Sequence, residues 1–255
     1  MDFEGKRVIV TGGTRGIGFA ISSAFAQRGA HVAMVFRDDQ ERANQTLKRI
    51  CEFNPEYEHL IVKADLSSPE VTASAFSRCL AGLGGLDIVV NNAGIGINHS
   101  VDTVGYDDWQ DIWEKTLACN LFGPANLSFC ASQHMIAAGG GRIVNVASRG
   151  AYRGEPEKPA YGASKAGLIS LGQSLAVSLA PHKIFVGTVA PGFVETDLSA
   201  DLMASEKGAE VRAQSPLGRI AQPEEVAHAV LFLASEGAEF STGTVIDVNG
   251  ASYLR

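Results

Sequence analysis

The sequence predicts an α/β fold in which helices cover both faces of a seven-stranded parallel sheet. Short apolar runs rich in β-branched residues alternate along the whole chain with longer amphipathic segments, and this alternation is typical of strand-helix-strand units. No Pro-, Gly- or Ser-rich linker, repeat or low-complexity tract divides the 255 residues. A chain of this length buries roughly 70 to 75 % of its unfolded surface. We therefore expect one domain over residues 1–255.

The apolar runs give the predicted strands, in chain order 7–11, 31–36, 59–64, 86–91, 142–147, 183–190 and 244–248. Between them lie segments long enough for right-handed crossover helices, at 16–28, 39–53, 69–81, 107–138, 160–180 and 223–235. Gly139 to Gly141 fit a C-cap for the long fourth helix. The stretch 192–222 follows a strand and holds only a short helical pattern, so we interpret it as an active-site lid.

Composition excludes several classes of function. The net charge of -7 argues against a nucleic-acid partner, because phosphate binding needs clustered Lys and Arg. The four cysteines and six histidines show no metal-ligand spacing, so we expect reduced thiols and no metal site. The first residues carry no apolar signal-peptide core, and no apolar stretch reaches membrane-spanning length. We expect a soluble, cytoplasmic protein that acts on a small molecule without a membrane.

Tyr161 and Lys165 stand four residues apart in a predicted helix, and such residues share one helix face. A phenol titrates near pH ~10, and a cation within about 4 to 6 Å stabilises the phenolate. The pair therefore predicts that Lys165 tunes Tyr161 as a general acid or base. Ser148 follows a predicted strand, where its hydroxyl would point to the same spot.

A glycine-rich turn connects the first predicted strand to the first helix, in Thr11-Gly12-Gly13-Thr14-Arg15-Gly16-Ile17-Gly18. Backbone N–H groups and the helix dipole at such a turn hold a pyrophosphate. The spacing differs from the more widespread Gly-x-Gly-x-x-Gly pattern, and the glycines alone also fit a tight strand-to-helix turn. The position within a strand-helix-strand unit favours a dinucleotide site.

Several motifs occur together and in order: this turn, Asn91-Asn92-Ala93-Gly94, Asn120, Ser148, Tyr161 with Lys165, and Pro191-Gly192. In this the chain resembles the short-chain dehydrogenase/reductase family over essentially its whole length. The resemblance implies a Rossmann-type sheet with strand order 3-2-1-4-5-6-7 and a homotetramer. It implies a catalytic tetrad of Asn120, Ser148, Tyr161 and Lys165, with Ser148 bound to the substrate oxygen, Lys165 on the nicotinamide ribose and Asn120 holding a relay water.

The same resemblance assigns residues to the nicotinamide cofactor. Asp65 would contact the adenine ring, although it fits equally well as the cap of the following helix. Asn91 and Asn92 would fix the adenosine half, and the same residues fit an ordinary turn. The complete expected set is Gly12, Thr14, Arg15, Gly16, Ile17, Gly18, Arg37, Asp65, Leu66, Asn92, Ala93, Gly94, Tyr161, Lys165, Pro191, Gly192, Val194 and Thr196.

The residues after the second predicted strand favour NADP(H) over NAD(H). NAD-dependent enzymes place an acidic residue there for the ribose 2′-hydroxyl, but this chain has Phe36 followed by Arg37. Arg37 and Arg15 could pair with a 2′-phosphate. In the competing interpretation Asp38 reaches the ribose and both arginines are solvated, so NAD(H) stays possible.

The substrate is less well predicted. Three hypotheses are an NADP(H)-dependent reductase or dehydrogenase of a small carbonyl or secondary alcohol, a 3-oxoacyl-(acyl-carrier-protein) reductase of fatty-acid synthesis, and a nucleotide-sensing scaffold without catalysis. Asn126 and Val177 stand where docking arginines for an acidic carrier are expected, which weakens the second. Arg149 and Arg153 either attract an anionic group or are solvated surface charges.

Overall fold

The computed structural model describes residues 1–255, with the side chain of Leu198 left out. Its seven strands form one parallel sheet in the order β3-β2-β1-β4-β5-β6-β7, so the predicted fold and strand order are confirmed. The strands are β1 (Arg7–Thr11), β2 (His31–Phe36), β3 (His59–Lys63), β4 (Ile88–Asn91), β5 (Gly141–Val146), β6 (Ile184–Pro191) and β7 (Val245–Val248).

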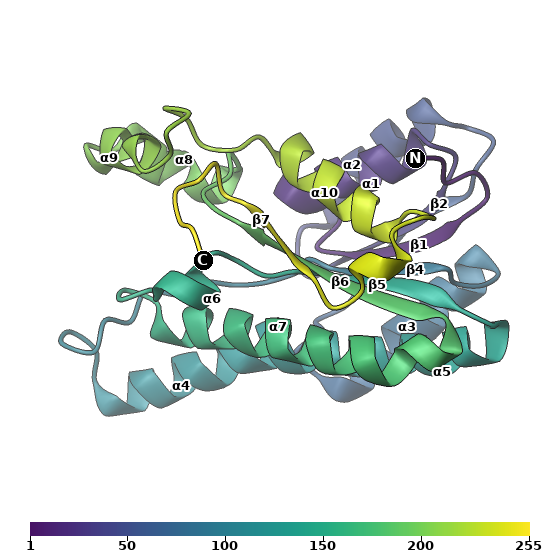
Figure 1. Ribbon diagram of the computed structural model, residues 1–255, viewed down its shortest axis with the longest axis horizontal. Coiled ribbons are helices and arrows are strands. Elements are labelled where there is room, and N and C mark those ends of the chain that lie inside the picture. Colours follow the sequence, from purple (N-terminus) through teal and green to yellow (C-terminus); the bar gives the residue numbers. More distant parts are fainter.

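Helices cover both faces of this sheet (Figure 1). On one face lie α1 (Gly16–Ala26), α2 (Gln40–Phe53) and α10 (Pro223–Ala234). The other face carries α3 (Pro69–Leu83), α4 (Tyr106–Leu117), α5 (Gly123–Ala138) and α7 (Pro159–Leu179). Each face has its own apolar core: Phe25 and Leu231 pack against the sheet on the first, Leu127 and Met135 on the second. Burial of these side chains, at roughly 25 cal/mol per Å² of apolar surface, holds the layers together.

The predicted helix 107–138 is interrupted in the structure. A π-helical turn, η1 (Ala118–Phe122), separates α4 from α5. Such a turn adds a residue to the helix, and π turns are frequent at functional sites. It places Asn120 in the interior with no exposed surface.

The stretch 192–222 holds two helices, α8 (Asp197–Ala204) and α9 (Lys207–Ala213), where the sequence predicted only a short helical pattern. They stand together at the carboxyl end of β6, apart from the main layers (Figure 1). A short helix that the sequence did not predict, α6 (Gly150–Arg153), follows β5, because four residues are too few to show a helical period. The C-terminus lies beside α6 (Figure 1).

Candidate active site

The candidate active site lies at the carboxyl edge of the sheet, where β1, β4, β5 and β6 end side by side. Thr11, Asn91, Val146 and Pro191 are the last residues of these strands. In an open parallel sheet, ligands bind at this edge, near the point where the strand order reverses. All motifs that the sequence analysis singled out follow directly from this edge or from the helices beside it.

Tyr161 and Lys165 lie on one face of α7, as their spacing predicts. The Nζ atom of Lys165 is 5.8 Å from the centroid of the Tyr161 ring. The lysine is buried, and its ammonium donates a hydrogen bond of 2.9 Å to the carbonyl oxygen of Val146 at the end of β5. Ser148 is also buried and its Oγ accepts a hydrogen bond of 3.0 Å from the Gly150 amide. β5 therefore positions both Ser148 and the lysine.

The pKa values of this pair differ from what the sequence predicted. Burial lowers the pKa of Lys165 to about 8. Burial also raises the pKa of the Tyr161 phenol, although its hydrogen bond with Ser148 acts in the opposite direction and the nearby Glu155 carboxylate adds to the rise. The pKa of Tyr161 is thus raised, where the spacing predicted that Lys165 lowers it, because burial removes the phenol from water and the Lys165 ammonium donates to Val146.

Asn120 connects three elements through its side-chain amide. Its Oδ1 accepts from the Ile95 amide at 2.8 Å, and its Nδ2 donates to the Ile95 carbonyl at 2.9 Å and to Ser164 Oγ at 3.0 Å. Gly94 lies directly against this amide and against Lys165, because a Cβ added at Gly94 would stand 3.2 Å from Lys165 Nζ and 3.3 Å from Asn120 Oδ1. The amide thus holds the loop after β4 onto α7, beside the lysine.

The glycine turn packs too tightly for side chains at several of its positions. Gly12 and Gly16 adopt φ values of 63° and 51°, which favour glycine. A Cβ on Gly18 would stand 2.0 Å from the Gly12 carbonyl oxygen, so backbone fills the space that a side chain would need. In the described part of the chain, no side chain caps the first turn of α1 and no acidic residue lies in it. The N–H groups at this helix start and its dipole therefore suit a pyrophosphate.

Side chains around the turn hold its shape. The side-chain amide of Asn92 donates to the Thr11 carbonyl at 2.9 Å. Thr11 Oγ1 in turn accepts from the backbone amides of Asn92 and Ala93. Thr14 is buried and its carbonyl accepts from the Thr46 hydroxyl. Ile17 is partly buried against the core. Asn92 and Ala93 thus link the end of β4 to the turn after β1, and Asn91 is used inside the core, where it donates to Ser128 and Asn145.

Arg37 and Asp38 form an exposed ion pair with an Nε–Oδ2 distance of 2.5 Å at the end of β2. Arg37, the expected partner of a 2′-phosphate, and Asp38, the expected partner of the ribose hydroxyl, therefore both lie at this position. Asp65 lies close by: burial acts to raise its pKa, but hydrogen bonds from Ser67 and the charge of Arg37 outweigh burial, and the pKa falls below its usual range. Leu66 is buried beside it. Arg15 is exposed at the start of α1.

The segment that follows β6 lies against the glycine turn. A Cβ on Gly16 would stand 3.2 Å from Thr196 Cγ2. Asp197 at the start of α8 forms an ion pair of 2.5 Å with Arg42 on α2. Val194 is buried and its strand-like bridge to Ala221 closes the base of the segment. Pro191 and Gly192 join β6 to this segment, with the Gly192 amide donating to the Val248 carbonyl.

Two side chains near the site were not singled out by the sequence analysis. His99 is buried, its Nδ1 lies 2.7 Å from the Ile97 carbonyl, and its Nε2 accepts from the Ala160 amide at the start of α7. It therefore fixes the start of the helix that carries Tyr161. Glu155 lies against Gly150 and acts on Tyr161 through its charge. The contact of His99 with Ala160 spans 61 residues, so no local spacing reveals it.

A family model described as enoyl-(acyl carrier protein) reductase matches residues 12–251. The chain belongs to the short-chain dehydrogenase/reductase family. Similar proteins include the 3-oxoacyl-(acyl-carrier-protein) reductase FabG of Aquifex aeolicus, 39 % identical with 98 % of both chains covered. Another is the cis-4-hydroxycyclohexanecarboxylate dehydrogenase of Sinomonas cyclohexanicum, 36 % identical over 97 % of this chain and 96 % of the relative.

Solved structures agree with this short-chain dehydrogenase/reductase assignment. A short chain dehydrogenase from Burkholderia cenocepacia J2315, in complex with NADP, has a TM-score of 0.89 at 32 % identity and 99 % coverage of both chains. A putative short-chain alcohol dehydrogenase from Sinorhizobium meliloti 1021 has a TM-score of 0.91 at 33 % identity, covering 98 % of this chain and 97 % of that one. The protein is an oxidoreductase that acts on alcohols or ketones with NAD(P), so the hypothesis of a non-catalytic scaffold was wrong. Among the described helices, none combines the length and apolarity needed to cross a bilayer.

Proposed function

We propose that this enzyme is an NADP(H)-dependent oxidoreductase that transfers hydride between the nicotinamide and a small carbonyl or secondary alcohol, with Tyr161 as the proton donor or acceptor. The observation that carries the proposal is that Ser148, Tyr161 and Lys165 converge at the sheet edge that also carries the glycine-rich turn. The bound nicotinamide supplies or accepts the hydride.

The residues of the chain supply the proton and the electrostatic stabilisation. The Tyr161 phenol is protonated at neutral pH, as an ordinary phenol is, and burial raises its pKa further. Its O–H therefore donates to the oxygen of a ketone as negative charge develops there. Ser148 Oγ–H is the second donor to that oxygen. Lys165, whose pKa of about 8 leaves it largely cationic at pH 7, stabilises the phenolate that remains.

The proposed cofactor site follows the glycine turn. Gly12, Thr14, Arg15, Gly16, Ile17 and Gly18 would hold the pyrophosphate, while Asp65, Leu66, Asn92, Ala93 and Gly94 would line the adenosine side. Pro191, Gly192, Val194 and Thr196 would cover the nicotinamide, with Tyr161 and Lys165 beneath it. Residues 192–222, including α8 and α9, form the proposed lid. The approach of Thr196 to Gly16 and the ion pair of Asp197 with Arg42 support a lid that closes over the glycine turn.

We assign NADP(H) as the preferred cofactor through Arg37. Its guanidinium is half exposed and its partner Asp38 is more exposed still. An exposed ion pair of this kind is worth about 0–1 kcal/mol, so a dianionic 2′-phosphate easily replaces Asp38 as the partner of Arg37. Arg15 at the glycine turn supplies a second cation.

The proposed homotetramer is supported by an exposed apolar stripe. Phe122, Phe129 and Ile136 recur every seven residues along η1 and α5 with exposed fractions of 54 %, 66 % and 37 %. Val177 on α7 is 80 % exposed. Helices α5 and α7 run side by side (Figure 1). Contiguous exposed apolar surface marks an interaction site, so these two helices form the proposed subunit interface.

The experiment that tests the proposed function measures NADPH oxidation on a panel of ketones and ketoesters, with the wild-type enzyme and Tyr161→Phe. We expect turnover only with the wild type, and nearly equal NADPH affinity for both, because the substitution removes the proton and little else. Tyr106→Phe is the control, since this tyrosine is exposed at the start of α4. Retained turnover in Tyr161→Phe would refute the assigned role.

A second candidate is a 3-oxoacyl-(acyl-carrier-protein) reductase, because several similar proteins carry that name. The surface argues against it: Asn126 and Val177 occupy the expected docking positions, and the net charge of -7 would repel an acidic carrier. Kinetics with an acetoacetyl thioester, free and on carrier protein, separate the two candidates. Turnover that improves sharply on the carrier would support the reductase of fatty-acid synthesis.

A further inference from the structure

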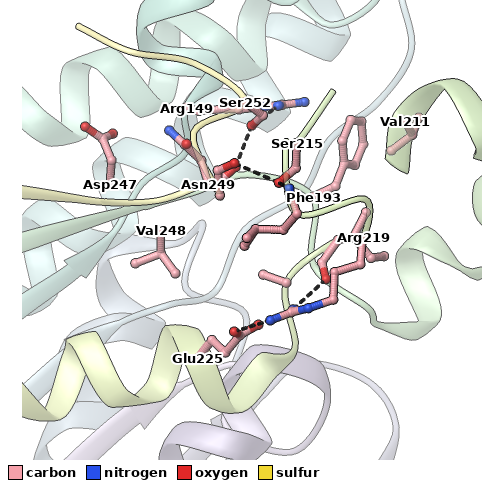
Figure 2. Close-up of a pocket in the computed structure, with 14 residues that line it drawn as sticks. Arg149, Phe193, Val211, Ser215, Arg219, Glu225, Asp247, Val248, Asn249 and Ser252 are labelled. Atoms are coloured by element: carbon pink, nitrogen blue, oxygen red, sulfur yellow. Dashed lines mark hydrogen bonds and ion pairs between the residues drawn. The ribbon is translucent and has the colours of Figure 1, made fainter. Parts of the chain in front are cut away.

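A pocket of about 250 Å³ lies between the end of the proposed lid and the end of β7. Figure 2 shows Arg149 and Ser252 at one end of it and Arg219 with Glu225 at the other. Among the described residues that line it, none is Asn120, Ser148, Tyr161 or Lys165. The pocket is thus separate from the residues assigned to catalysis, although Arg149 follows Ser148 directly in the chain.

The Arg149 side chain is the unusual feature of this pocket, since it is only 4 % exposed. A guanidinium carries five N–H donors. One donates to Ser252 Oγ and one to Gln214 Oε1, the latter at 2.6 Å. The other three find no acceptor in the described part of the chain. The guanidinium also lies over the Phe193 ring, 4.9 Å from its centroid.

No carboxylate of the described residues lies within ion-pair distance of Arg149. The two carboxylates of the pocket wall are already paired: Glu225 with Arg219 at 2.7 Å and Asp247 with Arg255 at 2.8 Å. A second cation stands close to Arg149 instead, because Arg153 donates to the same Gln214 Oε1 at 3.1 Å.

The pKa of Arg149 is consistent with a cation that has no carboxylate partner. Burial lowers the pKa of Arg149, the charge of Arg153 lowers it further, and the charge of Glu155 opposes both with a smaller effect. A buried charge without a counter-ion is costly, and two guanidinium groups that share one neutral oxygen repel each other. An anion in the pocket would relieve both costs and accept the unused N–H groups.

The rest of the wall indicates what kind of anion fits. Most of the pocket is lined by apolar side chains, those of Phe193, Val211, Leu217, Ile220 and Val248. The hydroxyls of Ser215 and Ser252 lie toward the end that holds Arg149 (Figure 2). Its volume is slightly below the range of about 300–1,000 Å³ that holds drug-sized ligands. We propose that this pocket binds the carboxylate of a small organic acid, with Arg149 as counter-ion and the apolar wall around the body of the acid.

The first test measures binding of benzoate and of its neutral analogue benzamide by titration calorimetry, to the wild type and to Arg149→Gln. We expect benzoate to bind the wild type more tightly than benzamide does, and Arg149→Gln to weaken benzoate binding at least tenfold. Lys48→Gln is the matched charge control, because Lys48 is exposed on α2, and it should bind benzoate as the wild type does. Equal binding of benzoate and benzamide, or of benzoate by a folded Arg149→Gln variant, would overturn the proposal.

A second variant keeps the test decisive if Arg149→Gln does not fold. Val211→Phe adds volume on the opposite wall while Arg149 stays in place, so it should also weaken benzoate binding, and unchanged binding would overturn the proposal. Binding needs no turnover, so this result is independent of the proposed catalytic function. Kinetics then identify the source of the acid: competitive inhibition by benzoate against the ketone makes the pocket a subsite for the substrate carboxylate, and non-competitive inhibition makes it a separate effector site. Both kinetic outcomes support the anion pocket.

Discussion

Replacing Lys165 with methionine should change how the stability of the cofactor-free enzyme depends on pH. In the unfolded chain the lysine holds its proton up to a pKa of 10.5, but in the folded protein its pKa is about 8. Between these values the unfolded state binds more protons, so the free energy of unfolding rises with pH. The gap corresponds to about 3 kcal/mol in full, of which about 2 kcal/mol appears between pH 7 and 9.5.

Lys165→Met lacks this titration, since methionine fills a similar volume without a charge. The variant also loses the hydrogen bond to Val146, a loss that is constant over this pH range. We therefore expect the wild type to gain about 2 kcal/mol relative to Lys165→Met from pH 7 to 9.5, which corresponds to about 4–8 °C in Tm for a chain of this size. Urea unfolding or calorimetry at several pH values measures the difference. Lys48→Met is the exposed control, and a wild-type advantage that stays constant or shrinks with pH would refute the reasoning.

Three further changes test the other parts of the site. Arg37→Asp should weaken NADPH binding more than NADH binding, because it puts a carboxylate where the 2′-phosphate would lie; equal losses, or none, would contradict the NADP(H) assignment. Gly18→Ala should weaken binding of both cofactors more than tenfold, since its Cβ would stand 2.0 Å from the Gly12 carbonyl oxygen; fluorescence titration with NADPH checks this, and unchanged affinity would show that the turn does not contact the cofactor. Phe129→Glu should reduce the oligomer size in light scattering by placing a charge in the exposed stripe on α5, and an unchanged mass would exclude this face as an interface.

Most of the sheet and the helices could be predicted from periodicity alone. Strand boundaries at 7–11 and 31–36 agree with β1 and β2 to the residue, because continuous apolar runs bounded by turns are typical of buried parallel strands. The π turn at Ala118–Phe122 was missed, since one additional residue in a helical turn leaves the amphipathic pattern on both sides intact. The pairing of Tyr161 with Lys165 followed from a spacing of four residues, which fixes two side chains on one helix face.

What could not be predicted depends on contacts between distant segments. The direction of the Tyr161 pKa results from burial, which no local pattern reveals. Arg149 was open to two interpretations in the sequence, and its burial depends on acceptors in Gln214 and Ser252, which are 65 and 103 residues away. No histidine shows a metal-ligand spacing in the sequence, yet His99 accepts a hydrogen bond from the backbone amide of Ala160, 61 residues further along.

The π turn has a consequence for how this enzyme can change in evolution or design. Asn120 points into the interior and Phe122 points outward from the same turn. One additional residue in the helix therefore orients both the amide that holds the loop after β4 and the first aromatic side chain of the exposed stripe. Deleting one residue there to restore regular α-helix would rotate everything that follows by about 100° about the helix axis. The proposed active site and the proposed subunit interface therefore both depend on this one π turn, and moving either would disturb the other.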